Sequence, residues 1–129
     1  MAITGIPSLL PELDLEFLNE KGFDCKVTQV GAEVRVVISG FPFPHQYTPR
    51  TARLMLRLPA GFPNANPDMF WTNPDVRLTN GNFPLNANYY DPSAGGWQRW
   101  SRHDNSWRPG TDDLRTKIAS VRRELEAGR

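Results

Sequence analysis

The segment TARLMLRLPAGFP, residues 51–63, decides the fold, because it joins the most regular strand pattern of the chain to a proline-rich turn. Apolar and charged side chains alternate along it: Ala52, Leu54, Leu56 and Leu58 on one face, and Arg53 and Arg57 on the other. Strict alternation predicts a strand with one buried and one solvated face. Pro59 and Pro63 then restrict the backbone of the turn.

Two more strand patterns and a short helix are expected before this segment. Residues 25–30 and 32–39 alternate apolar and polar side chains and meet at Gly31, which predicts paired strands with a turn between them. Residues 11–21 carry Leu13 and Phe17 at helical spacing, and Gly22 follows where a left-handed residue could end a helix. After the segment, only residues 69–71 predict another short strand.

The C-terminal residues predict a second helix. Thr111 is placed to cap it, with Asp112 and Asp113 in the first turn and Gly128 beyond the end. Its apolar stripe consists of Leu114, Ile118, Val121 and Leu125, and its basic residues Arg115, Lys117, Arg122 and Arg123 are expected on a solvated face. Strands followed by a helix, without alternating crossovers, indicate an α+β domain with an antiparallel sheet and helices on one face.

Length and composition indicate one globular domain, residues 1–129, and restrict its partners. Apolar residues make up 39% and charged residues 22%, and the formal net charge is +1. The net charge therefore creates no overall electrostatic field that would attract nucleic acid or an anionic membrane. The single cysteine, Cys25, excludes an internal disulfide, and no apolar run approaches the roughly 20 residues that span a bilayer. A cytoplasmic location is expected.

Four short motifs follow one another: LPAGFPNANP at residues 58–67, NPDV at 73–76, NGNFPL at 80–85 and WRP at 107–109. In this order they resemble the ubiquitin-conjugating enzyme family, whose matching motifs are Y-P-F-x-x-P, H-P-N-V, N-G-x-I-C-L and W-x-P. The resemblance implies a four-stranded antiparallel meander with an N-terminal and a C-terminal helix packed on it. It also implies two partners, a ubiquitin-like protein and an activating-enzyme-like protein.

Two departures from the family motifs bear on function. Pro84 stands where the family has the cysteine that carries the modifier as a thioester, and a proline offers no nucleophile. Asp75 stands where the family's asparagine is thought to stabilise the oxyanion, and a carboxylate would repel that charge. The resemblance is therefore to a divergent, bacterial conjugating-enzyme-like family without the catalytic cysteine.

Neither Cys25 nor a bound metal is expected to replace the missing catalytic cysteine. Cys25 lies in a predicted strand, where free cysteines are usually buried. His45 lies in a proline-aromatic loop, and two histidines with scattered carboxylates make no zinc motif. No phosphate loop or dinucleotide motif is present, so no cofactor is expected.

The segment 84–107 is longer than the family's, is predicted to be a long aromatic-rich loop, and leaves three interpretations open. In the first, it folds over the sheet and its tryptophans enlarge the core. In the second, it is a recognition surface formed by Tyr89, Tyr90, Trp100 and Arg102. In the third, it is catalytic: His103 beside Asp104 acts as a base for a serine, Ser101 or Ser106, which carries an oxyester.

The sequence therefore predicts an atypical conjugating-enzyme-like component of a bacterial ubiquitin-like modification pathway. It would bind the ubiquitin-like protein, the activating enzyme or both, without a thioester cysteine. The alternatives are a scaffold of the same fold that performs no chemistry, and an oxyester carrier that uses a serine.

Overall fold

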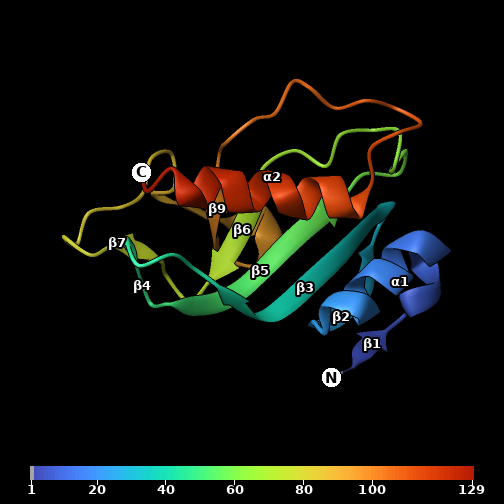
Figure 1. The fold of residues 1–129 in the computed structure, drawn as a ribbon, viewed down its shortest axis with the longest axis horizontal. Helices are drawn as coiled ribbons and strands as arrows, with labels where there is room; N and C mark the ends of the chain where they lie inside the picture. The colour runs from blue at the N-terminus through green and yellow to red at the C-terminus, as the bar shows by residue number, and fades with distance from the viewer. Residues whose placement is uncertain (1) are drawn as a thin grey trace.

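The computed structural model describes residues 2–129. Its elements, in chain order, are β1 (Ile3–Gly5), the 3-10 turn η1 (Pro7–Leu9), α1 (Glu12–Lys21), β2 (Asp24–Val30), β3 (Glu33–Pro42), β4 (Tyr47–Thr48), β5 (Thr51–Leu58), β6 (Phe70–Asn73), β7 (Arg77–Leu78), β8 (Tyr89–Asp91), η2 (Pro92–Ala94), β9 (Trp97–Trp100) and α2 (Leu114–Glu126). Figure 1 shows α2 lying along one face of the sheet and α1 beside its N-terminal strands.

The main sheet contains the predicted meander but is wider than predicted. Its strand order is β1-β2-β3-β5-β6-β9-β8, and β4 and β7 form a separate two-stranded sheet. Strands β2, β3, β5 and β6 are antiparallel neighbours, as expected for the four-stranded meander. At one edge β1 pairs with β2 in parallel, so the sheet is mixed rather than wholly antiparallel.

The other edge corrects the expectation of a long loop at residues 84–107. There β9 pairs with β6, and β8 pairs with β9, both antiparallel. The 3-10 turn η2 joins the two added strands, and its Gly95 cap adopts φ 74. Much of the segment therefore extends the edge of the sheet instead of folding over it, although Trp100 joins the core as the first interpretation expects.

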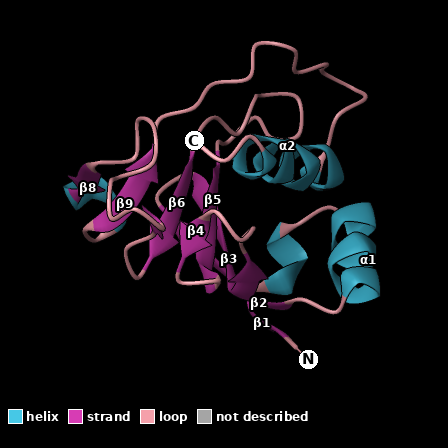
Figure 2. Cartoon of the chain, turned by 60° about the vertical axis from the view of Figure 1, so that its left-hand side comes forward, coloured by secondary structure: helices cyan, strands magenta, loops and turns pink. Residues whose placement is uncertain are grey.

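Both helices pack on the same face of the sheet (Figure 2), as predicted. The apolar stripe of α2 is buried, with Leu114, Ile118, Val121 and Leu125 each at most 2% exposed. On α1 Phe17 is buried, whereas Leu13 is 72% exposed, which corrects its expected place on the packed face. Gly22 ends α1 in the left-handed conformation at φ 72.

The start of α2 also differs from the prediction. Asp113, not Thr111, is its N-cap: the Asp113 carboxylate accepts a hydrogen bond from the Thr116 amide at 3.3 Å, and Thr116 Oγ1 accepts one from the Asp113 amide at 3.2 Å. This reciprocal capping box satisfies two amides that no helical carbonyl can reach. None of the described helices has the length and apolar character needed to cross a membrane.

Candidate functional site

Two loops that carry family-like motifs lie together beside β9. The first motif loop is residues 73–76 and the second is residues 80–87. Gln98, which is 1% exposed on β9, joins them: its Oε1 accepts hydrogen bonds from the Val76 amide at 2.7 Å and from Thr72 Oγ1 at 2.9 Å. Its Nε2 donates to the carbonyls of Val76 at 2.9 Å and Ala87 at 2.8 Å. The amide of one buried side chain therefore fixes both loops.

The two residues that depart from the family motifs occupy different environments. Pro84 is buried, and its carbonyl accepts a hydrogen bond from the Ala87 amide at 3.1 Å. The side chain of Asp75 is 44% exposed and accepts a hydrogen bond from the Tyr90 hydroxyl at 2.5 Å, with Arg77 3.7 Å away. This hydrogen bond raises the pKa of Tyr90 above its ordinary value. Asp75 therefore already has partners within the protein.

Cys25 lies in the core, as expected. It is 4% exposed on β2, where it pairs with Ile3 and Ile38, and four strands of the sheet lie between β2 and the edge strand β8. Burial, with a smaller contribution from Asp24, raises the pKa of the thiol to about 11. A protonated, enclosed thiol is a poor nucleophile.

The residues after β9 connect the second motif loop to α2. The Ser101 amide donates to the Asn86 carbonyl at 2.9 Å. The Arg102 side chain turns inward, is 4% exposed, and donates to the carbonyl of Leu85 at 3.1 and 3.2 Å, to that of Glu124 at 3.2 Å and to that of Arg129. Arg102 is therefore an internal anchor of this segment.

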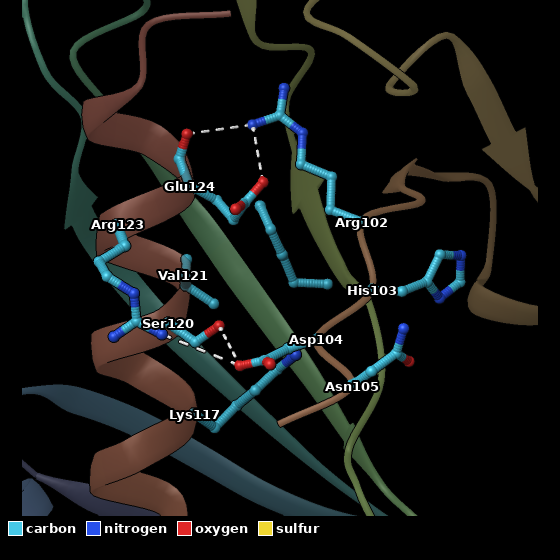
Figure 3. Close-up of a pocket in the computed structure, with 10 residues that line it drawn as sticks. Arg102, His103, Asp104, Asn105, Lys117, Ser120, Val121, Arg123 and Glu124 are labelled. Atoms are coloured by element: carbon cyan, nitrogen blue, oxygen red, sulfur yellow. Dashed lines mark hydrogen bonds and ion pairs between the residues drawn. The ribbon is translucent and has the colours of Figure 1, made fainter. Parts of the chain in front are cut away.

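His103 and Asp104 point in different directions, which corrects their expected pairing. In Figure 3 the His103 ring points away from α2, whereas Asp104 points toward it. The Asp104 carboxylate accepts hydrogen bonds from the Ser106 amide at 2.9 Å and from Ser120 Oγ at 3.4 Å, and lies 3.8 Å from Arg123. Hydrogen bonds from Ser106 are the main cause that lowers the pKa of Asp104. Asp104 therefore joins the loop after β9 to helix α2.

The carboxylate that contacts His103 is Asp68, 35 residues earlier in the chain. Asp68 Oδ2 lies 2.6 Å from His103 Nδ1, and Ser101 Oγ lies 3.4 Å from His103 Nε2. The structure therefore brings the predicted histidine and serine within 3.4 Å of each other, but Asp68 and not Asp104 contacts the ring. Adjacent side chains such as those of His103 and Asp104 diverge on an extended backbone, whereas a residue from another loop can approach the ring.

A cavity of about 190 Å³ lies between the loop after β9 and α2. It is lined by the side chains shown in Figure 3, including Lys117 and Glu124. Lys117 is only 6% exposed, which corrects its expected place on a solvated face. Burial lowers the pKa of Lys117 to about 8, and the negative charges of Asp68, Asp104 and Glu124 partly oppose this effect.

The four residues predicted to form a recognition surface divide into two pairs. Tyr89 and Tyr90 on β8 are 46% and 44% exposed, so they are available to a partner. Trp100 is fully buried and stacks on Phe70, with ring centroids 5.1 Å apart. Trp100 and the internal anchor Arg102 therefore do not belong to a surface, because the side chains of both are buried.

No group of three or more histidine, cysteine, aspartate or glutamate side chains that could hold a metal ion occurs within residues 2–129. The arrangement that the described residues do offer is an acid–imidazole–hydroxyl chain beside the second motif loop.

Sequence reasoning assigned no role to Gln98, placed Lys117 on the solvated face of its helix, and did not consider Asp68. The first two had a detectable pattern: Gln98 is two residues from Trp100 on a strand, and Lys117 is three residues after Leu114 and four before Val121 on a helix. Each spacing places the polar residue on the buried face. Asp68 had no such pattern, because it lies in an irregular segment.

Comparison with known families gives one match. Residues 10–128 match the family model described as Prok-E2_E, Prokaryotic E2 family E. No curated protein and no solved structure matches the chain.

Proposed function

The chain belongs to prokaryotic E2 family E, and from this membership we propose that it is an atypical conjugating-enzyme-like component of a ubiquitin-like modification pathway. It binds the pathway's ubiquitin-like protein, its activating enzyme or both, and it forms no thioester. Two features support the absence of a thioester. The single cysteine, Cys25, is buried with a raised pKa, and Pro84 stands in a motif that resembles the one in which the wider family has its cysteine.

An exposed aromatic surface beside the motif loops supports binding of a protein partner. Three large apolar side chains in this region are 44–47% exposed: Leu85, Tyr89 and Tyr90. Arginines accompany them, with Arg77 stacked 3.6 Å from the ring centroid of Phe83 and Arg99 stacked 4.4 Å from that of Tyr89. Aromatic residues and arginine are the side chains most enriched at the energetic centres of protein interfaces.

The proposal is tested by combining the purified chain with ATP and the activating-enzyme-like and ubiquitin-like proteins of its own genome. Isothermal titration calorimetry should show binding to at least one of the two proteins. Non-reducing gels should show no adduct that a thiol reagent cleaves. Absence of binding to both proteins would remove the proposed function, and a thiol-cleavable adduct on Cys25 would remove the claim that no thioester forms.

The surface is tested by replacing both tyrosines. The double variant Tyr89→Ser and Tyr90→Ser should weaken binding by at least tenfold, since a central aromatic contributes about 2 kcal/mol or more when it anchors an interface. Leu13→Ser is the matched control, because Leu13 is 72% exposed on α1, away from β8. Equal binding by the double variant and the wild type would place the partner on another surface.

A further inference from the structure

The chain of polar contacts through Ser101, His103 and Asp68 resembles in connectivity the arrangement that activates a hydroxyl nucleophile. The Asp68 carboxylate contacts Nδ1 of the imidazole at 2.6 Å, and the Ser101 hydroxyl is 3.4 Å from Nε2, on the other side of the ring. Because the carboxylate accepts a hydrogen bond from Nδ1–H, Nε2 of a neutral ring is free to accept a proton from the serine. The ring is accessible, with the His103 side chain 52% exposed.

The backbone around this chain is held in place from both sides. The Ser101 amide donates a hydrogen bond to the Asn86 carbonyl, and Arg102, the residue between the serine and the histidine, is anchored by its buried side chain. Asp68 is tied to the same region, since Asn66 Nδ2 donates to the Asp104 carbonyl at 2.8 Å. Contacts between the two loops, and from these loops to the second motif loop and α2, therefore hold the three side chains together.

Two backbone outliers also border the cluster. Within residues 2–129 the non-glycine residues with positive φ are Met69, at 61°, and Asn86, at 55°. Met69 directly follows Asp68, and Asn86 accepts the hydrogen bond from Ser101. The left-handed conformation is strained for a side chain such as methionine, and such strain concentrates at functional sites.

We propose that Ser101 is an oxygen nucleophile that His103 activates and Asp68 orients, and that it accepts the acyl group of a protein C-terminus held as a thioester. This proposal rests on the proposed function for its substrate, which is the thioester between a ubiquitin-like protein and its activating enzyme. The amide of Ser101 donates a hydrogen bond to the Asn86 carbonyl, which holds the serine against the second motif loop.

The transfer is balanced in atoms and charge. Ser101 Oγ bonds to the acyl carbon while its proton passes to His103 Nε2. The carbon–sulfur bond breaks, and the departing thiolate takes the proton from the imidazolium. The products are a serine oxyester and the free thiol of the activating enzyme, and the histidine returns to its neutral form. Asp68 forms no bond to the substrate and acts as a positioning residue.

A fluorophosphonate probe tests the nucleophile without any pathway protein. The hydroxyl displaces fluoride from phosphorus, and peptide mass spectrometry identifies the labelled residue. The wild type should be labelled on Ser101, Ser101→Ala should not be labelled, and His103→Gln should react about 10² to 10⁴ times more slowly. Ser106→Ala is the matched control, a hydroxyl on the same loop that donates to Asp104 instead of contacting the histidine. An unlabelled wild type, or equal labelling of Ser101→Ala, would overturn the proposal.

The role of Asp68 is tested by a spectroscopic property of the histidine. In the wild type the imidazole ¹⁵N shifts should show a protonated Nδ1 and an unprotonated Nε2 in the neutral ring. Asp68→Asn should reduce this preference and slow labelling, and Asp68→Glu should restore both in part. An unchanged tautomer and labelling rate in Asp68→Asn would refute the positioning role.

The reaction with pathway proteins separates this proposal from the proposed function. Wild-type chain should form an adduct that hydroxide cleaves and thiol reagents do not, and Ser101→Cys should form one that thiol reagents cleave. Binding without any adduct overturns the serine chemistry and leaves the binding function intact. Labelling of Ser101 by the probe, with no binding to either protein, supports the nucleophile and removes the proposed substrate.

Discussion

Replacing Lys117 with methionine should stabilise the protein, because the lysine carries its charge into the cavity beneath the loop after β9. Its pKa of about 8 lies well below the 10.5 of an ordinary lysine, and burial is the main cause. One pKa unit corresponds to about 1.4 kcal/mol, so the ionised side chain lowers the free energy of unfolding by about 3 kcal/mol at neutral pH. Methionine has a similar length and carries no charge.

The pH dependence provides a sharper test than stability alone. Below pH 8 the lysine is protonated in the folded and the unfolded chain, so the full penalty applies. Between about pH 8 and 10.5 the unfolded chain binds the proton more tightly, and the penalty therefore disappears as the pH rises. Lys117→Met should raise the free energy of unfolding by about 3 kcal/mol at pH 7, and the gain should be markedly smaller at pH 9.5.

Urea unfolding followed by tryptophan fluorescence at both pH values measures this effect. Lys26→Met makes the same substitution at an exposed lysine on β2 and should change the free energy of unfolding little at either pH. A destabilised Lys117→Met variant at pH 7 would contradict the reasoning. So would a gain of equal size at pH 7 and 9.5, since it would show that packing rather than charge is responsible.

Three further predictions concern other buried polar groups. Gln98→Met should cost about 3 kcal/mol or more in urea unfolding, because it leaves buried groups of both motif loops without partners. Asp14→Asn should stabilise the protein by about 1–3 kcal/mol at pH 8 and much less at pH 4, because burial raises the Asp14 pKa to about 6. The asparagine can still accept the hydrogen bond from the Leu114 amide. Equal gains at both pH values would count against this. Cys25 should react with iodoacetamide only after unfolding, and rapid labelling of the native chain would refute its burial.

The regular core of the fold could be predicted because its periodicity is local. The alternation in residues 51–58 gave β5 with its observed bounds, Thr51–Leu58, and the stripe of α2 identified four buried residues. The added hairpin could not be predicted in this way. Gln98 is a polar residue on the inward face of β9, and its hydrogen bonds with the backbone of the two motif loops and with the Thr72 hydroxyl make its burial favourable. Those partners become visible only in three dimensions.

The candidate site was predictable in part for a related reason. Its histidine and serine are two residues apart, and one short segment of sequence contains both. The orienting carboxylate comes from the loop before β6, and its approach depends on contacts such as that of Asn66 with the Asp104 carbonyl. The sequence offered no pattern that points to Asp68, and the adjacent Asp104 does not contact the ring because neighbouring side chains diverge on an extended backbone.

The errors in predicting Trp100 and Arg102 have one physical cause, and it bears on the proposed nucleophile. Both side chains were assigned to a surface on residue type, yet each is buried: Trp100 packs against Phe70, and Arg102 donates hydrogen bonds to backbone carbonyls. Burying a guanidinium costs several kcal/mol unless hydrogen bonds compensate, and the hydrogen bonds of Arg102 tie this segment to the second motif loop and to α2. A serine and a histidine on either side of such an anchor lose little conformational entropy on reaching a reactive arrangement. The burial that made the prediction from composition wrong also restricts the backbone on both sides of Arg102, and a preorganised hydroxyl nucleophile requires such restriction.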